Sequence, residues 1–513
     1  MKKKIIFLLF CFFSFLINLS FQIKADDFSS RSFFSVQRIF GPTTPECVSI
    51  KHDQIRLYEE EKRFSFDATA FGGTTFNEDD LAKYFLPFQK KEIIAGELGS
   101  KAVMQGDVDV IANYFGVLTS NFYTIGSPVN GTFNNYTFQS KVKFAPRQTF
   151  AGVTLTYKQH LSRYLDKGFW FELVVPIETV TNTIGMTEEI TTAGGPNGNN
   201  PTIPPGFVPN MTAAFRQSTW RFGKINGPQS ATGVADLYFK IGYLTLKEEN
   251  YFLRSYAGLS FPTGNQVTGE FLFEPIVGQN KHATLFGATS IGFKVWSRCD
   301  KSIYMELDTC GTLFFSNNQI RSFDIKDKSW SRYMWVYLDS TTTTTSPGIN
   351  VFTKNLNVQP GTARDLNTAL IYRDGDFQAE GGYHFYSRQA EEVKFAKPWQ
   401  EGPGIAAIYN SANEFISGGQ TRDNATIKQY TGIDNDTING NFVFRELQES
   451  DFDMESASHP ALIAHTIYVA LSGHWDQCGR HPKFFGVGGS YEFSSNNAAT
   501  QRWMAWARFG LSF

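Results

Sequence analysis

Charged side chains recur at every second position in several segments of this 513-residue chain, each time opposite apolar neighbours. In a β-strand such alternation places the two kinds of side chain on opposite faces. If the apolar face points outward, the charged set lines the interior of a closed sheet, where each charge must be paired or hydrated. The residues of this inward set are Lys141, Lys143, Lys158, Glu172, Asp236, Lys240, Arg254, Lys294, Glu306, Asp308, Arg373, Asp376, Glu380, Glu492 and Arg508.

This set predicts a lumen that is either filled with water or closed by salt bridges. Its eight cations and seven anions nearly balance, which argues against strong charge selectivity. His384 and His474 fall on the same inward face. A polar lining of this kind serves the passage or exclusion of small solutes rather than a reaction.

Motifs for catalysis and metal binding are missing from the sequence. The eight histidines are scattered singly, without a His-Glu-x-x-His or Cys-x-x-Cys arrangement for zinc. The chain also has no Gly-x-Ser-x-Gly nucleophile motif. We therefore expect no enzyme activity, no metal and no cofactor. The net charge of -2 gives no basic face for a nucleic acid.

The N-terminus predicts export. Lys2 to Lys4 precede the apolar run from Ile5 to Ile17, and Ala25 offers a small residue for cleavage. We expect a signal peptide over residues 1–25 and a mature chain from Asp26. Four cysteines remain in that chain, Cys47, Cys299, Cys310 and Cys478, and their spacing assigns no disulfide pairs. No later run reaches the 18 apolar residues of a membrane-spanning helix, so membrane crossing would require a closed β-barrel.

The last eleven residues alternate clearly, with apolar side chains at every odd position from Trp503 to Phe513. This ending, with Phe509, Leu511 and the terminal Phe513, resembles the C-terminal signal of Gram-negative outer-membrane β-barrels. The resemblance implies an outer-membrane location after signal cleavage, with membrane lipid and the barrel-assembly machinery as partners. It leaves the oligomeric state open.

Alternation predicts an all-β, antiparallel transmembrane barrel of twelve strands with long extracellular loops. A favoured two-residue turn at Asp374-Gly375 joins two of these strands. Short and long connections also segregate to opposite ends, as outer-membrane barrels require. An apolar run at 330–338 and a strand-like stretch at 63–72 leave fourteen strands as the alternative. The other ten expected strands are 138–145, 149–158, 168–178, 234–245, 251–262, 284–296, 301–315, 461–475, 483–493 and 503–513.

Three parts of the chain follow: the signal peptide, an N-terminal segment over 26–137 that is periplasmic or fills the lumen, and a barrel over 138–513. The turn Leu259-Ser-Phe-Pro-Thr-Gly264 resembles one in outer-membrane proteins linked to aromatic-compound degradation, relatives of the long-chain fatty-acid transporters. We expect a porin-like channel for small solutes. The alternatives are a transporter of hydrophobic compounds with an N-terminal plug, and a structural or surface-interaction barrel.

Overall fold

A computed structural model describes most of the chain after the predicted signal peptide, and residues 1–25 themselves lie outside the described residues. Cys478 also lies outside them. The described ranges are 27–35, 41–50, 64–96, 107–109, 138–161, 168–192, 208–248, 250–340, 345–409, 415–417, 443–475 and 483–513.

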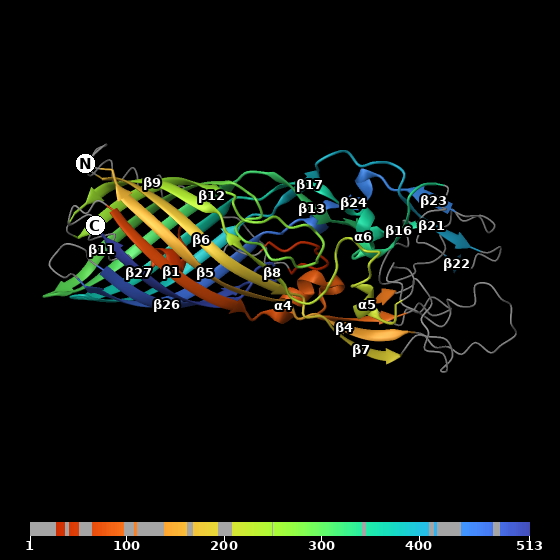
Figure 1. Ribbon diagram of the computed structural model, residues 1–513, viewed down its shortest axis with the longest axis horizontal. Coiled ribbons are helices and arrows are strands. Elements are labelled where there is room, and N and C mark those ends of the chain that lie inside the picture. Colours follow the sequence, from red (N-terminus) through yellow and green to blue (C-terminus); the bar gives the residue numbers. More distant parts are fainter. Residues whose placement is uncertain are drawn as a thin grey trace.

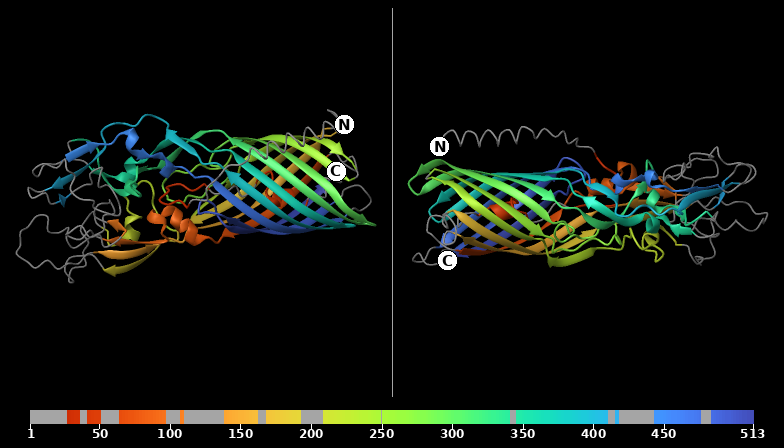
Figure 2. Two further views of the ribbon diagram at one scale, coloured as in Figure 1. Left: turned by 180° about the vertical axis from the view of Figure 1, so that it is seen from behind. Right: turned by 90° about the horizontal axis from the view of Figure 1, so that it is seen from above.

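The main sheet is a closed antiparallel barrel (Figures 1 and 2). It contains 13 strands, one of which, β8 (Gln229–Val234), only continues the pairing along β6 beyond the end of β9. The other twelve form a ring that closes where β1 pairs with both β27 and β5. In order around the ring they are β1 (Phe64–Thr75), β5 (Arg147–His160), β6 (Phe169–Thr183), β9 (Leu237–Lys247), β10 (Tyr251–Phe261), β11 (Thr284–Arg298), β12 (Lys301–Phe314), β18 (Ala363–Asp374), β19 (Phe377–Arg388), β25 (Leu462–Trp475), β26 (Lys483–Ser494) and β27 (Arg502–Ser512).

The predicted number of strands is confirmed, but one member of the ring differs from the prediction. The stretch at 63–72, left as an alternative, is barrel strand β1, so the barrel does not begin at residue 138. The predicted strand at 138–145 is instead β4 (Gln139–Lys143), which belongs to a separate four-stranded sheet. It alternates because Ser140 and Val142 face the interior of another part of the molecule. Alternation identifies a strand with one buried face, but not the core that the face covers.

The two ends of the barrel have different connections. The strand ends that flank the short connections 161–168, 248–250, 299–300, 375–376 and 476–482 lie at one end of the barrel, where Phe64 and the C-terminal Phe513 also meet. At that end Gly375 adopts a φ of 56° in the predicted turn. The long connections gather at the other end, as predicted, although β1 and β5 are joined through 76–146 rather than by the expected short loop 146–148.

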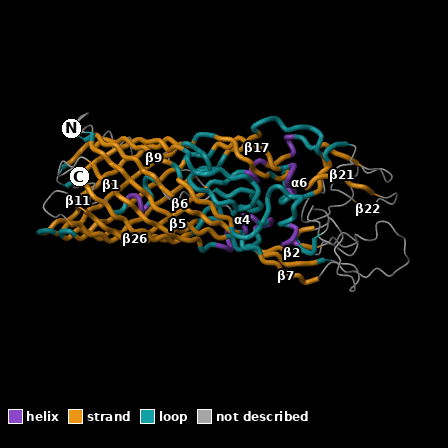
Figure 3. The backbone as a smooth tube through the Cα atoms, in the orientation of Figure 1, coloured by secondary structure: helices purple, strands orange, loops and turns teal. Residues whose placement is uncertain are grey.

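The described parts of the long connections form a second structured part, which we call the outer domain (Figures 1 and 3). Residues 27–35 pack against it. Helix α4 (Glu78–Phe85) and the short helices α5 (Met211–Ala214) and α6 (Gly348–Val351) lie there, with the 3-10 turns η1 (Pro87–Gln89), η3 (Ser331–Tyr333), η4 (Glu449–Asp451) and η5 (Met454–Ala457). Its sheets are β3-β2-β4-β7, β13-β17-β20, β14-β24 and β16-β15-β21-β22, with β23 beside β21. Their bounds are β2 (Glu92–Gly96), β3 (Val108–Asp109), β7 (Thr187–Thr192), β13 (Asn317–Ser322), β14 (Asp324–Ile325), β15 (Trp335–Tyr337), β16 (Thr345–Pro347), β17 (Thr353–Gln359), β20 (Glu392–Phe395), β21 (Gly404–Tyr409), β22 (Phe415–Ser417), β23 (Val443–Glu446) and β24 (Phe452–Asp453).

The barrel and the outer domain bury opposite kinds of side chain. The outer domain has aromatic cores, one of which contains Phe215, Trp220, Trp330 and Tyr333. The apolar run at 330–338 belongs to this domain and adds no barrel strand. On the barrel, alternate apolar residues are exposed around the wall, including Val153, Ile177, Ile241, Leu259, Leu285, Met305, Leu370, Val469 and Val487. In the part of the chain that the structure describes, no helix is long and apolar enough to span a membrane.

Candidate functional site in the occluded lumen

Most of the predicted inward residues are buried inside the barrel. Burial follows from strand alternation, because each of them neighbours an exposed or half-exposed apolar residue of the wall. Lys294 is only half-buried and lies near the end with short turns, beside the Tyr304 ring. The fully buried members on barrel strands are Lys158, Glu172, Lys240, Arg254, Glu306, Asp308, Arg373, Glu380, Glu492 and Arg508.

Four predicted lumen residues, Lys141, Lys143, Asp236 and Asp376, lie elsewhere. Lys143 is exposed on the same strand β4 as Lys141, and Asp376 is exposed in the turn between β18 and β19. Lys141 was wrongly placed in the lumen, because its strand belongs to the outer domain. There it is exposed and its Nζ atom lies 2.9 Å from Glu92 Oε1. Asp236 is fully buried, but it follows β8 rather than lying within a barrel strand, and its carboxylate faces Gly278 of the loop between β10 and β11.

Ion pairs between adjacent strands, or between strands two apart in the ring, organise the lumen charges. Lys240 Nζ lies 2.6 Å from Glu172 Oε1, and the two residues are direct partners in the β6–β9 register. Arg254 Nη2 lies 3.6 Å from Asp308 Oδ1, while Ser290 donates a hydrogen bond to the same carboxylate. Pairing compensates part of the cost of removing these charges from water. The lining is therefore a set of fixed pairs rather than a row of free charges.

Two further pairs involve residues that sequence reasoning missed. Arg508 Nη2 lies 2.9 Å from Asp67 Oδ2, and Arg502 Nε lies 3.1 Å from Glu492 Oε1. Asp67 was missed because β1 was not assigned to the barrel. Arg502 was missed because the last strand was taken to begin one residue later. The same alternation, extended by a few residues, would have identified both.

Residues 41–50 lie inside the barrel, and we call this segment the plug (Figures 2 and 3). It contains the short helix α2 (Pro45–Val48), which begins with Pro45 at a position where the backbone needs no N–H donor. Arg508 Nη1 donates hydrogen bonds to the carbonyl oxygens of Ser49 (3.0 Å) and Cys47 (3.4 Å). The plug is thus fastened to β27 through its backbone.

Other strands of the wall also hold the plug. Trp506 Nε1 donates to Ser49 Oγ at 3.2 Å, and the backbone N–H of Ile50 donates to Glu380 Oε2 at 3.1 Å. The Ile50 side chain is 1% exposed and packs with Phe484 and Tyr468 in an apolar cluster within the lumen. Through these contacts, part of the expected N-terminal segment fills the lumen. Nothing in the sequence of the plug, which has no strand periodicity, indicated its partners.

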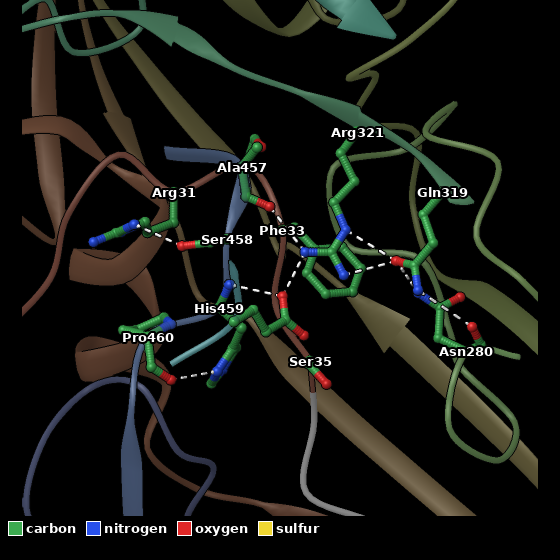
Figure 4. A network of polar contacts seen from close by, with 12 residues as sticks. Arg31, Phe33, Ser35, Asn280, Gln319, Arg321, Ala457, Ser458, His459 and Pro460 are labelled. Atoms are coloured by element: carbon green, nitrogen blue, oxygen red, sulfur yellow. Dashed lines mark hydrogen bonds and ion pairs between the residues drawn. The ribbon is translucent and has the colours of Figure 1, made fainter. Parts of the chain in front are cut away.

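A buried polar network fixes the chain just before the plug to the outer domain (Figure 4). The Arg321 guanidinium lies 3.4 Å from the centroid of the Phe33 ring, and its Nη1 atom lies 2.5 Å from Glu391 Oε2. Arg388 Nη1 donates to Ser35 Oγ at 3.0 Å. The N-terminal segment is therefore held at both the outer domain and the lumen.

Burial and neighbouring charge set the protonation states in this network. Burial alone would raise the pKa of Glu391, but the Arg321 and Arg388 guanidinium groups lower it to about 2. Burial and the charge of Arg388 lower the pKa of His459 to about 3. At neutral pH the network consequently contains an ionised Glu391 and an uncharged His459.

Comparisons with known proteins return structures but no sequence relatives. No family model and no curated protein matches the chain. An outer-membrane channel from Pseudomonas putida F1 is 9% identical, with 88% of this chain and 96% of that chain covered and a TM-score of 0.39. A FadL homologue from Pseudomonas aeruginosa is 7% identical, with 95% and 98% covered and a TM-score of 0.26. The toluene transporter TbuX from Ralstonia pickettii is 8% identical, with 96% and 99% covered and a TM-score of 0.26.

Proposed function

We propose that the protein is an outer-membrane channel for small solutes and that its lumen is closed by the plug, residues 41–50 of its own chain. The observation that carries this proposal is the attachment of the plug to lumen side chains, through Arg508, Trp506 and Glu380. The space that remains beside the plug at Glu46 is about 20 Å³, enough to hold one group of the size of water. Passage of a solute therefore requires the plug to move.

Moving the plug breaks these attachments but none of the hydrogen bonds that close the wall. Each neutral hydrogen bond contributes about 1 kcal/mol, and a bond to a charged group about 1.5–3 kcal/mol. Burying Ile50 adds roughly 1.5–3 kcal/mol. The closed ladder of the barrel wall does not depend on these contacts. The plug can leave while the wall remains intact.

A disulfide between the plug and the wall tests this function. A Cβ atom built on Gly486 would lie 3.0 Å from Ile50 Cγ1, close to the spacing of about 3 Å that a disulfide imposes between Cβ and the opposite Sγ. The variant Ile50→Cys/Gly486→Cys, with the native cysteines replaced by serine, would lock the plug in place. The same protein in its reduced form is the matched control. We expect current steps in planar bilayers after reduction and none in the oxidised form.

Equal conductance of the oxidised and reduced forms would contradict closure by the plug. A reduced protein that never conducts would instead contradict the channel itself and support the structural alternative. Identical migration on gels before and after boiling would show that the sample is not a folded barrel, since paired strand edges resist SDS. This control separates loss of folding from loss of function.

Transport of a hydrophobic compound is the second candidate. It is favoured by the apolar cluster around Ile50, which includes Phe71, Phe150, Phe484 and Trp506 inside the barrel. Uptake of toluene into proteoliposomes by the reduced form, without ion current, would support this candidate over a channel for polar solutes.

Location and assembly belong to the same proposal. The apolar outer wall supports residence in lipid, and Phe513 stacks on Phe64 at the closure of the ring, with centroids 4.9 Å apart. We propose that Phe509, Leu511 and Phe513 form the signal for the barrel-assembly machinery. Deletion of Phe513 should reduce outer-membrane assembly without reducing export, and normal surface exposure of the truncated protein would contradict this role.

A further inference from the structure

A small polar cavity lies between the plug and the wall. Its volume is about 20 Å³, and both charged and hydroxyl side chains line it. From the plug come Thr44 and Glu46, and from the wall come strands β18, β19, β25, β26 and β27. The wall side chains that matter here are Asp365, His384, Thr466, Ser490, Glu492 and Arg502.

Glu46 is the unusual member of this cavity. Glu46 is 1% exposed, and neither oxygen of its carboxylate has a hydrogen-bond partner within the protein. The nearby Thr44 hydroxyl donates to the Gly41 carbonyl oxygen at 3.0 Å instead. Leaving a buried carboxylate without a donor is costly. The cavity in front of Glu46 is therefore suited to an occupant that donates hydrogen bonds.

The surrounding charges favour a cation. Arg502 already pairs with Glu492, Nε to Oε1, at 3.1 Å. Asp365 Oδ1 lies 3.1 Å from His384 Nε2, a contact that an uncharged imidazole makes as well. Among the described carboxylates that line the cavity, Glu46 is the one with neither an ion-pair partner nor a hydrogen-bond donor from the protein. A positive occupant would complete the balance of charge.

The kind of cation follows from geometry and size. Among the described residues, no group of three His, Cys, Asp or Glu side chains is placed to hold a metal ion. Thr466, Ser490 and Glu46 line the cavity instead, and their hydroxyl and carboxylate oxygens can accept hydrogen bonds. An N–H donor of the size of water fits the cavity volume and can satisfy the Glu46 carboxylate.

We propose that the Glu46 cavity binds a primary ammonium group, either as the ammonium ion or as the end group of a small amine. The inference rests on the proposed function, because a group bound between plug and wall belongs to the class of solute that the channel admits. The Glu46 carboxylate accepts hydrogen bonds from the ammonium group, and Arg502 remains paired with Glu492. Bound ammonium thus ties the plug to the opposite strands.

Binding is tested with the full chain in detergent, where no transport is needed. Ammonium chloride should raise the unfolding temperature more than potassium chloride at the same ionic strength, because a ligand of the folded state stabilises it. Potassium is the control because it has nearly the size of ammonium but donates no hydrogen bonds. Equal shifts with the two salts would overturn the proposal, without any variant that might fail to fold.

The variant Glu46→Gln locates the site. It should weaken ammonium binding by at least about tenfold, which corresponds to the loss of one charge-assisted hydrogen bond. The matched control is Glu306→Gln, which neutralises another buried lumen carboxylate that does not line this cavity. Equal losses in both variants, or no loss in Glu46→Gln, would overturn the assignment to Glu46.

Methylammonium and ethanolamine distinguish the two sources of the group. Binding of ammonium alone would identify the free ion, and binding of all three would identify the end group of an amine. Either result supports a primary ammonium site. The outcome is independent of the bilayer experiment, since the plug could close the channel without binding ammonium, and ammonium could bind in a barrel that never opens.

Discussion

The barrel wall and the outer domain are both built from strands, yet they place their apolar side chains on opposite sides. Wall strands are 11–15 residues long and expose Ile241, Leu370 and Val469 while they bury charged residues. The paired outer-domain strands β2, β4, β13 and β17 are 5–7 residues long, and the domain buries Trp220 and Trp330 completely. The medium outside the surface explains the difference, because lipid favours an apolar exterior and water an apolar core.

The largest effect is expected in the outer-domain core. Trp330→Ala removes an indole that packs 5.3 Å from Tyr333 and donates from Nε1 to the Phe85 carbonyl oxygen at 3.0 Å. Truncating a buried aromatic costs about 3–5 kcal/mol. Near-ultraviolet circular dichroism should show early loss of the outer domain while the barrel remains heat-modifiable. The control Trp503→Ala, at a side chain 49% exposed on the wall, should change little. Simultaneous loss of both parts in Trp330→Ala would contradict the separation.

The second prediction concerns the wall. Leu307→Arg places a charge on the lipid face of β12 and should cost roughly 2–4 kcal/mol if the site lies near the middle of the bilayer. Charge reversal at the neighbouring Glu306 should instead alter ion selectivity or conductance once the plug is open. Cysteine labelling measures the two faces directly. Labelling of Leu307→Cys from water, with Glu306→Cys protected, would reverse the orientation assigned to this strand.

The contrast between the wall and the outer domain explains which features of the structure could be predicted from the sequence. Alternation located eleven of the twelve barrel strands and placed residues such as Lys240 and Arg254 on the inward face, because a membrane wall has one apolar and one polar side along its whole length. It did not separate β4 from β1, since both have one buried face. The plug contacts of Glu46 and Ile50 and the pairing of Arg321 with Glu391 depend on residues distant in sequence. The alternation of neighbouring residues therefore could not predict these contacts.

Acid should affect the outer domain mainly through one buried carboxylate, Glu391, and two buried histidines, His459 and His282. The pKa of Glu391 is lowered to about 2, so its stabilisation is present above its ordinary value of 4.5 and is lost as pH falls towards 2. The pKa of His459 is lowered from 6.5 to about 3, so below pH 6.5 the unfolded chain binds a proton that the folded site resists. Each of these contributions makes the stability of the outer domain fall as the pH falls.

Between pH 6.5 and 4.5 the two buried histidines should dominate, because burial also lowers the pKa of His282 to about 4, and each contributes up to about 1.4 kcal/mol for each pH unit. His459→Gln should flatten this part of the pH dependence, as measured by urea unfolding of the outer domain. The matched control is His465→Gln, a residue of β25 whose side chain is on the outward face of the barrel. An unchanged slope in His459→Gln would show that another group controls the acid sensitivity.

The smallest effect is expected at Lys141, the residue that the sequence placed in the lumen and the structure places outside it. Its side chain is 43% exposed, and that of its partner Glu92 is 40% exposed. An exposed ion pair contributes about 0–1 kcal/mol, because water and salt screen the charges and the side chains lose freedom. A double-mutant cycle with Lys141→Ala and Glu92→Ala should give a coupling energy in this range that decreases with added salt. In the lumen, removal of one partner from a buried pair such as Lys240 and Glu172 should cost several times more, about 3–5 kcal/mol. A coupling of that larger size at Lys141 would mean that β4 is buried against the barrel interior after all, and the boundary between the wall and the outer domain would have to be redrawn.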